Sequence, residues 1–226
     1  MDLKENTNQV FQQVTKAIQE TGREDGSVSV IAVTKYVDIA TAANLIDQGV
    51  KHIGENRVDK FLEKYHALSD KSDKDVTWHL IGSLQRRKVK DVIPFVDYFH
   101  ALDSLKLAQE IQKRADRTVK CFLQVNISGE ESKHGFSKEE LLTVLPDLSS
   151  LDNIEYVGLM TMAPFEAQTE ELQKIFKETQ ELQQYIREQQ FPNMPMTELS
   201  MGMSRDYKEA IQCGSTFVRI GTAFFK

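Results

Sequence analysis

Two kinds of hydrophobic pattern alternate along the chain. Short runs rich in β-branched residues are apolar on both faces, which is typical of parallel strands covered by helices. The longer segments between them repeat apolar residues every three or four positions, which predicts amphipathic helices. We expect eight strands, over residues 28–36, 51–54, 76–82, 96–102, 119–127, 154–162, 196–201 and 216–221.

Helices are expected before the first strand and in the intervals between strands. The predicted ranges are residues 6–21, 38–48, 56–68, 85–93, 104–115, 137–148, 169–190 and 204–213. Strict alternation of strand and helix predicts a parallel sheet, and eight repeats predict closure into a TIM-type (β/α)8 barrel with one extra N-terminal helix. An open doubly wound sheet is the alternative, but no G-x-G-x-x-G follows the first strand.

Length and composition narrow the picture further. The 226 residues suffice for one barrel and no linker divides them, so a single domain over 1–226 is expected. The net charge of -6 argues against a nucleic-acid partner or an anionic membrane surface. No apolar run is long enough to cross a membrane, and the polar start lacks the order of a signal peptide.

These features predict a cytoplasmic protein. Its two cysteines, Cys121 and Cys213, are interpreted as small buried side chains in a reducing compartment. No long exposed apolar helix demands a partner, so we expect a monomer.

In such a barrel the functional site forms at the C-terminal ends of the strands. Lys35 ends the first strand and shares a face with Ile31 and Val33, so its amine is expected at the mouth above an apolar floor. Burial lowers the pKa of a lysine and leaves free amine, which Schiff-base formation requires. A lysine that simply extends into solvent is the alternative.

A phosphate is expected on the loops after strands seven and eight. These loops combine glycines, whose N–H groups can approach an anion, with hydroxyl donors: Gly202 and Gly221, and Ser200, Ser204 and Thr222. The helix predicted to begin at Ser204 would point its positive end at the same site. Ordinary turn and capping chemistry, with Ser204 as an N-cap, is the alternative.

Charged and aromatic polar residues add weaker indications. Arg219 lies in an otherwise apolar strand and stays charged, so it needs either an acidic neighbour or a ligand such as a pyridine nitrogen. His79 is interpreted as a satisfied core histidine. The spacing of the other histidines does not indicate a metal site. The basic residues within 86–90 are interpreted as a solvated face, and Lys133 as an exposed residue within reach of a ligand.

A set of motifs in fixed order resembles the pyridoxal phosphate homeostasis proteins, also called the YggS/PROSC family. The resemblance covers residues 30–225, and its motifs are Ala32-Val-Thr-Lys35, Ile53-Gly-Glu-Asn-Arg57, Trp78-His-Leu-Ile-Gly-Ser-Leu-Gln85, Gln124-Val-Asn126, Gly158-Leu-Met-Thr-Met162, Leu199-Ser-Met-Gly-Met-Ser204 and Val218-Arg-Ile-Gly-Thr222. It implies a barrel like the N-terminal domain of alanine racemase, which holds pyridoxal 5′-phosphate (PLP) as a Schiff base.

The resemblance also implies roles for single residues. Lys35 matches the Schiff-base lysine, and Arg219 matches the arginine near the pyridine nitrogen. The phosphate cradle is matched by Ser200, Ser204, Gly221 and Thr222, and two pocket positions by Asn56 and His79.

Three functions are compatible with these residues. The first is a PLP carrier without turnover, whose recipients would be PLP-dependent apo-enzymes. The second is an amino-acid racemase, which requires acid–base groups on both faces of its substrate. Alanine racemases take one of these from a C-terminal β-domain of the partner subunit, and the predicted barrel leaves no residues for such a domain. The third is a phosphate-binding barrel enzyme without PLP. We favour the carrier.

Overall fold

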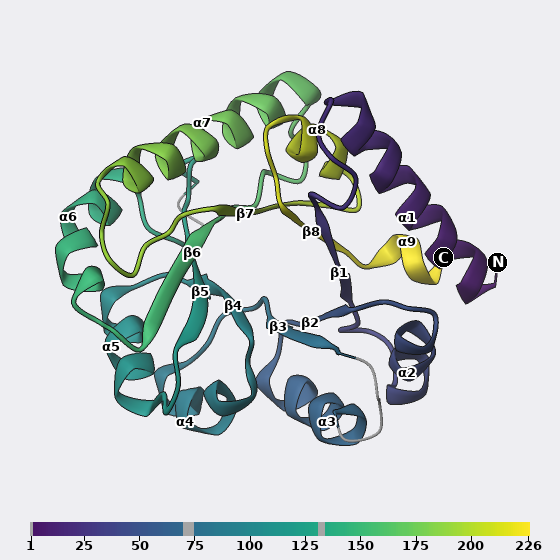
Figure 1. Ribbon diagram of the computed structural model, residues 1–226, viewed down its shortest axis with the longest axis horizontal. Helices are drawn as coiled ribbons and strands as arrows, with labels where there is room; N and C mark the ends of the chain where they lie inside the picture. The colour runs from purple at the N-terminus through teal and green to yellow at the C-terminus, as the bar shows by residue number, and fades with distance from the viewer. Residues whose placement is uncertain (1, 70–74, 131–133) are drawn as a thin grey trace.

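The computed structural model describes residues 2–69, 75–130 and 134–226. Within these residues the strands form one closed parallel barrel in chain order, in which β8 pairs with β1 (Figure 1). The eight strands described are β1 Ser29–Val33, β2 His52–Glu55, β3 Thr77–Leu80, β4 Tyr98–Leu102, β5 Val119–Gln124, β6 Ile154–Met160, β7 Glu198–Met203 and β8 Phe217–Ile220. The predicted TIM-type barrel is confirmed.

Helices surround the barrel. The longer ones are α1 Leu3–Glu20, α2 Ile39–Asp47, α3 Val58–Leu68, α5 Leu105–Arg114, α6 Lys138–Ser149 and α7 Thr169–Glu188. The shorter ones are the 3-10 turns η1 Arg86–Lys88 and η2 Ile93–Phe95, and the helices α4 Val89–Val92, α8 Tyr207–Gln212 and α9 Thr222–Phe225. The single helix predicted over 85–93 is therefore wrong, because a four-residue α-helix flanked by 3-10 turns takes its place.

Two boundaries near the expected site differ from the prediction. Strand β1 ends at Val33, so Lys35 lies in the following turn and not on the strand. The helix after β7 begins at Tyr207 and not at Ser204, because residues 204–206 form a turn in which the Met203 N–H donates to Asp206 (N to Oδ1, 2.5 Å). Ser204 is therefore not the N-cap of this helix.

The helices pack on the barrel through one apolar face each. In α7 the buried positions recur every three or four residues and include Leu172, Ile175, Phe176, Leu182 and Ile186. The strands contribute their outward faces to the same layer, and four of the five residues of β1 are buried. This two-sided burial explains the continuous apolar runs in the sequence.

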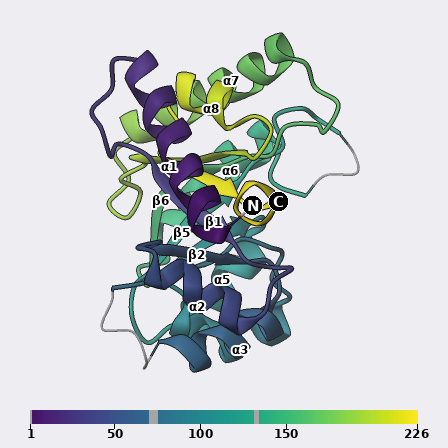
Figure 2. The same ribbon diagram turned by 90° about the vertical axis from the view of Figure 1, so that its right-hand side faces the viewer.

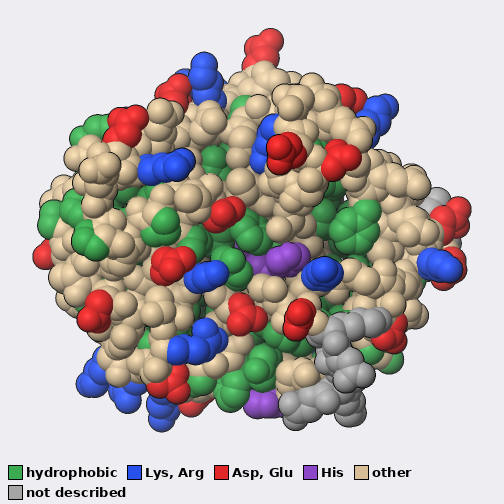
Figure 3. Space-filling model, in the orientation of Figure 1, with side chains coloured by type: hydrophobic (Ala, Val, Ile, Leu, Met, Phe, Trp, Pro, Cys, Tyr) green, Lys and Arg blue, Asp and Glu red, His purple; other side chains and the backbone are tan. Residues whose placement is uncertain are grey.

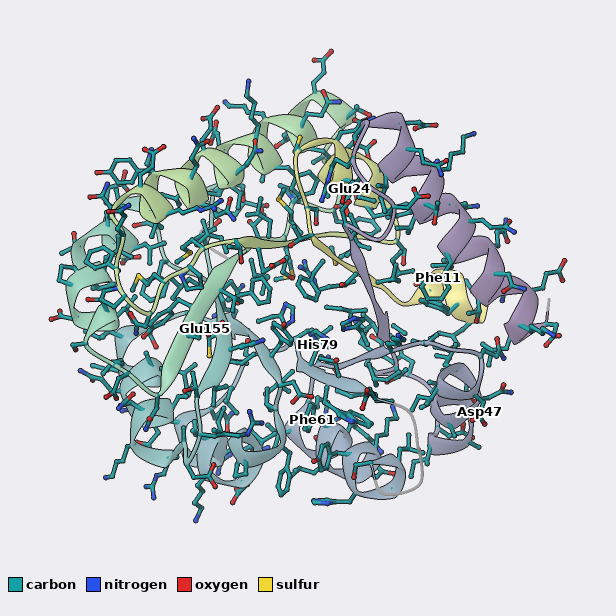
Figure 4. The ribbon with its side chains drawn as sticks, in the orientation of Figure 1. Phe11, Glu24, Asp47, Phe61, His79 and Glu155 are labelled. Atoms are coloured by element: carbon teal, nitrogen blue, oxygen red, sulfur yellow. The ribbon has the colours of Figure 1, made fainter. Side chains whose placement is uncertain are left out.

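The barrel interior is filled differently. The Phe217 ring lies among the rings of Tyr98 and Phe122, with centroids 5.4 and 5.6 Å away. TIM barrels usually fill this space with Val, Ile and Leu. Here three histidines from β2, β3 and β4 share the space with the aromatic rings, and Figure 4 shows His79 inside the ring of strands.

The two ends of the chain lie side by side (Figure 2). The α9 helix, which the sequence did not predict, packs against α1. Asn6 in α1 donates to the backbone carbonyls of Phe224 and Lys226, both at 3.1 Å. The rings of Phe11 and Phe224 meet edge to face. These tertiary contacts stabilise a four-residue helix that would not form alone.

Two smaller points follow from the described residues. None of their helices is long and apolar enough to cross a membrane. Both cysteines carry free thiols, and Cys121 is buried as predicted, whereas Cys213 is only half-buried.

Candidate ligand site at the C-terminal end of the barrel

Lys35 is exposed in the turn that follows β1. Its Nζ lies 4.9 Å from the centroid of the Tyr36 ring, which is itself 89% exposed. The expected buried amine above an apolar floor is therefore wrong for this structure. The side chain is free to move, and its long stem lets the amine reach a ligand bound at the mouth of the barrel.

Below this turn lies a buried ion pair that the sequence did not indicate. Lys64 of α3 donates to Glu55 at the end of β2 (Nζ to Oε1, 2.5 Å) and to the Thr34 carbonyl at 2.6 Å. The Thr34 hydroxyl donates to the same Glu55 oxygen at 2.6 Å. Both charged side chains are almost fully buried. The pair fixes the backbone directly before Lys35 to β2 and α3.

The loops after β7 and β8 meet, as the phosphate prediction requires. The Gly221 N–H donates to the Ser204 hydroxyl at 3.3 Å. A Cβ added to Gly221 would lie 3.3 Å from the Val33 carbonyl oxygen, so this glycine is beside the end of β1. The Gly221 N–H and the Ser204 hydroxyl therefore lie together beside Val33, the last residue of β1. Val33 is two residues before Lys35.

Glycine at position 202 is a geometric requirement of the same region. Its φ of 95° lies in the left-handed region. A Cβ there would come within 2.6 Å of the Ala210 Cβ and 2.9 Å of the Tyr207 Cα. Gly202 therefore lets the end of β7 turn tightly over α8, which brings Ser204 to the mouth.

Arg219 is buried in β8 and firmly held. Its Nη1 donates to the Ser200 carbonyl at 2.8 Å and to the Ser200 hydroxyl at 2.7 Å, and its Nη2 donates to the Thr161 carbonyl at 3.0 Å. Burial lowers the pKa of Arg219 to about 10, an effect that nearby Asp206 opposes, so the guanidinium stays charged at neutral pH. An arginine has five N–H donors, and these three bonds leave others for a ligand.

Among the described residues, Arg219 forms no ion pair with a carboxylate, so the alternative of a structural ion pair is not what the structure shows. Backbone carbonyls and one hydroxyl satisfy it instead. Such partners orient the guanidinium of Arg219 without neutralising its charge. The charge remains available to an acceptor at the mouth of the barrel.

The other predicted site residues fall into two groups. Asn56 and Thr222 lie at the mouth, half-buried and exposed respectively. The loop that carries Asn56 packs tightly on the next one, because a Cβ added to Gly82 would come within 2.0 Å of the Asn56 carbonyl oxygen. Ser200 and His79, in contrast, are fully buried in the barrel interior. Lys133 lies outside the described residues.

Two interior residues were not identified from the sequence. His100 lies on β4 between His79 and Ser200, at 2.9 and 2.8 Å from their polar atoms, and His52 contacts His79 at 3.0 Å. A usable signal was present, since one histidine occurs on each of three consecutive strands. Among the described residues no group of His, Cys, Asp or Glu side chains is placed to hold a metal ion.

The donor set fits a phosphorylated aromatic aldehyde. An exposed primary amine, a backbone N–H beside a hydroxyl, and a charged guanidinium lie at the adjoining ends of β1, β7 and β8. These groups match an aldehyde carbon, a phosphate and a ring nitrogen respectively.

Comparisons with known proteins agree with this fold. The family model of the alanine racemase N-terminal domain matches residues 8–226. Alanine racemase of Clostridium difficile superposes with a TM-score of 0.73 at 16% identity, and the match covers 93% of this chain and 54% of the racemase chain. These findings define the class as a barrel of the alanine racemase N-terminal domain type.

Closer relatives are covered over nearly their full length. The pyridoxal phosphate homeostasis protein of Aquifex aeolicus is 36% identical over 228 residues, which span 100% of this chain and 98% of the relative. The structure of PipY from Synechococcus elongatus with PLP bound superposes with a TM-score of 0.88 at 32% identity, and covers 100% of both chains. The chain belongs to the family of pyridoxal phosphate homeostasis proteins.

Proposed function

We propose that this protein binds pyridoxal 5′-phosphate through a Schiff base on Lys35 and serves PLP homeostasis without catalysing turnover. The observation that carries the proposal is that the loops after β7 and β8 meet beside the end of β1. Gly221, paired with Ser204, lies against Val33 at the end of the strand that leads to Lys35. The family relationship and the PLP-bound PipY structure support the choice of ligand.

The residues of the chain divide the work of binding. The Lys35 amine would hold the aldehyde carbon of PLP as a Schiff base, with the carbonyl oxygen released as water. The Gly221 N–H, with the hydroxyls of Ser204 and Thr222, would bind the phosphate. Arg219 would donate to the pyridine nitrogen. A charged donor there leaves the nitrogen unprotonated, which restrains the carbanion chemistry that PLP otherwise supplies.

A racemase using the same site is the second candidate, because the family model is named for alanine racemase. The coverage favours homeostasis. The chain matches only 54% of the C. difficile racemase chain, whereas it spans 98% of the A. aeolicus homeostasis protein. Racemisation needs a second acid–base group opposite the lysine. The racemase candidate predicts D-alanine formation from L-alanine with added PLP, and turnover of about 10 per second would refute the carrier.

The direct test is covalent trapping. The protein is loaded with PLP, reduced with borohydride and digested, and the modified peptide is identified by mass spectrometry. We expect one PLP adduct, on Lys35, and visible absorbance that borohydride removes. Lys35→Ala should lose both signals completely.

The matched control is Lys208→Ala, which removes an exposed lysine of α8. This variant should retain the adduct at the level of the unaltered protein. An adduct on any lysine other than Lys35 would refute the site, and absence of PLP binding would favour the phosphate-binding enzyme without PLP.

We also propose that the protein is a cytoplasmic monomer. The PLP that it holds would pass to PLP-dependent apo-enzymes. The free thiols of Cys121 and Cys213 suit a reducing compartment. Light scattering on the purified protein measures the oligomeric state, and a dimer mass would refute the monomer. Transfer is tested by following activity of a PLP-free transaminase mixed with the loaded protein.

A further inference from the structure

Three histidines form a continuous chain inside the barrel, which we term the histidine relay: His52 of β2, His79 of β3 and His100 of β4. His52 Nδ1 lies 3.0 Å from His79 Nε2, and His79 Nδ1 lies 2.9 Å from His100 Nε2. His79 and His100 are fully buried, whereas His52 is half-buried. Histidine side-chain atoms are visible near the centre of the face shown in Figure 3.

The relay ends at the arginine of the candidate site. His100 Nδ1 lies 2.8 Å from the Ser200 hydroxyl, which accepts from Arg219 Nη1 at 2.7 Å. The rings are held by stacking, His79 on Tyr98 with centroids 5.0 Å apart and His100 on Phe122 at 4.4 Å. The stacking holds the ring nitrogens within hydrogen-bond distance of their neighbours in the relay.

The ring nitrogen that carries the proton in each histidine follows from Arg219, at one end of this chain of hydrogen bonds. Arginine can only donate, so the Ser200 oxygen accepts from Arg219. If Ser200 donates its single proton to His100 Nδ1, then His100 carries its proton on Nε2 and donates to His79. His79 then donates from Nε2 to His52 in the same way. Every donor from Arg219 Nη1 to His79 Nε2 then meets an acceptor.

The opposite order is unfavourable. His100 would donate from Nδ1 to Ser200, whose oxygen would already accept from Arg219. The hydroxyl proton would then have no acceptor among the hydrogen bonds of the described residues, and a buried unpaired donor costs about 1–3 kcal/mol.

Charge limits each buried ring to a single proton. Burial, together with the charge of Arg219, holds the pKa of His100 well below its usual value, and burial with the neighbouring histidines does the same for His79. Both rings are neutral and carry one proton each. A cationic His100 would place two positive charges on either side of one hydroxyl.

We propose that Ser200 and His100 are positioning residues for Arg219, and that the histidine relay fixes the hydroxyl of Ser200 as the acceptor that aims the guanidinium at the ring nitrogen of the cofactor. The inference rests on the proposed function for the identity of that nitrogen. It adds an assignment that the sequence did not give, since Ser200 was expected to contact phosphate. Its burial between Arg219 and His100 gives it a different role.

The test uses two ligands that differ at one atom. These are PLP and 1-deazapyridoxal 5′-phosphate, in which a C–H replaces the ring nitrogen. Ser200→Ala removes the acceptor from Arg219, and we expect PLP affinity to fall about tenfold, the equivalent of one lost hydrogen bond. The affinity for the deaza compound should not change, because that ligand makes no bond to Arg219. A merely structural role would weaken both ligands equally.

A second pair of variants keeps the test independent of one substitution. His100→Asn places its amide where Nδ1 stood and can still bond Ser200, whereas His100→Gln places it near Nε2 and loses that bond. We expect the preference for PLP over the deaza compound to persist in His100→Asn and to fall about tenfold in His100→Gln. The control is His66→Gln, an exposed histidine of α3 outside the relay, which should alter neither affinity.

Nitrogen-15 NMR of the ligand-free protein reads the tautomers directly. Protons on Nε2 of His79 and His100 are expected, and protons on Nδ1 would overturn the relay. Equal losses for both ligands, or no loss for either, would overturn the positioning role. Absence of PLP binding by the unaltered protein would instead refute the proposed function, and the tautomer measurement would still decide the order of the relay.

Discussion

The barrel interior and the C-terminal mouth hold their polar groups in opposite ways. Inside, Arg219, His79 and His100 are buried, and each makes defined hydrogen bonds. At the mouth, Lys35 and Thr222 are exposed and carry no such network. The difference separates two tasks. A preorganised cation needs a rigid setting, whereas a lysine that forms and breaks a covalent bond needs freedom to move.

Burial also decides how much stability a substitution costs. Buried polar groups cost stability when their partners are removed, because the remaining group is left desolvated and unpaired. Exposed groups at the mouth cost little, since water replaces their contacts. Substitutions of buried polar residues in the wall or the interior of the barrel should therefore lower the free energy of unfolding. Substitutions at the mouth should change ligand binding alone.

The largest effect is expected from Lys64→Met, which breaks the buried ion pair and leaves the Glu55 carboxylate without its cation. We expect the free energy of unfolding to fall by about 3–5 kcal/mol, measured by urea denaturation. The control in the same helix is Lys60→Met, which breaks the exposed pair with Glu63 and should cost less than about 0.5 kcal/mol. Equal losses in the two variants would show that burial does not govern the effect.

The next effect is a dependence of stability on pH. Burial, followed by the neighbouring histidines for His79 and by Arg219 for His100, lowers the pKa values of both rings well below 6.5, so both stay neutral in the folded protein. In the unfolded chain they bind protons as the pH falls below about 6.5. The unfolded state then holds more protons, so folding stability falls with falling pH and is fully present above about 6.5.

The slope for each histidine should approach about 1.4 kcal/mol per pH unit as the pH falls from about 6.5 to 5, measured as the free energy of unfolding. His100→Asn should remove the contribution of one histidine. The exposed His66 supplies the control, because His66→Gln should leave the slope unchanged. A flat profile in the unaltered protein would mean that the interior histidines are charged in the folded state.

The smallest effect on stability is expected at the mouth. Lys35→Ala removes an exposed side chain that contacts the Tyr36 ring, so the free energy of unfolding of the ligand-free protein should change by less than about 0.5 kcal/mol. Circular dichroism during thermal unfolding measures this. A larger loss would show that Lys35 has a structural role that its exposure does not indicate.

Most elements of the barrel could be predicted because their signals are local. The β1 run is buried on both faces, and the apolar spacing of α7 gives one buried stripe, so the sequence pattern and the packing agree. The predictions failed where the chain depends on distant contacts. The α9 helix is held by Asn6 and Phe11 from the other end of the chain, and no local pattern records that contact.

The candidate site divides in the same way. The positions of Lys35 at one strand end and of Ser204 and Gly221 at two others follow from the order of the strands, which the sequence alone determined. Closure of the barrel decided which of these ends meet and which side chains are buried. It placed Ser200 and His79 inside, left Lys35 exposed, and joined Lys64 to Glu55. Chain periodicity specifies which way a residue faces within its own element. Burial and hydrogen-bond partners depend on residues 100 or more positions apart, as in the His100–Ser200 and Asn6–Phe224 bonds, and only the folded chain brings them together.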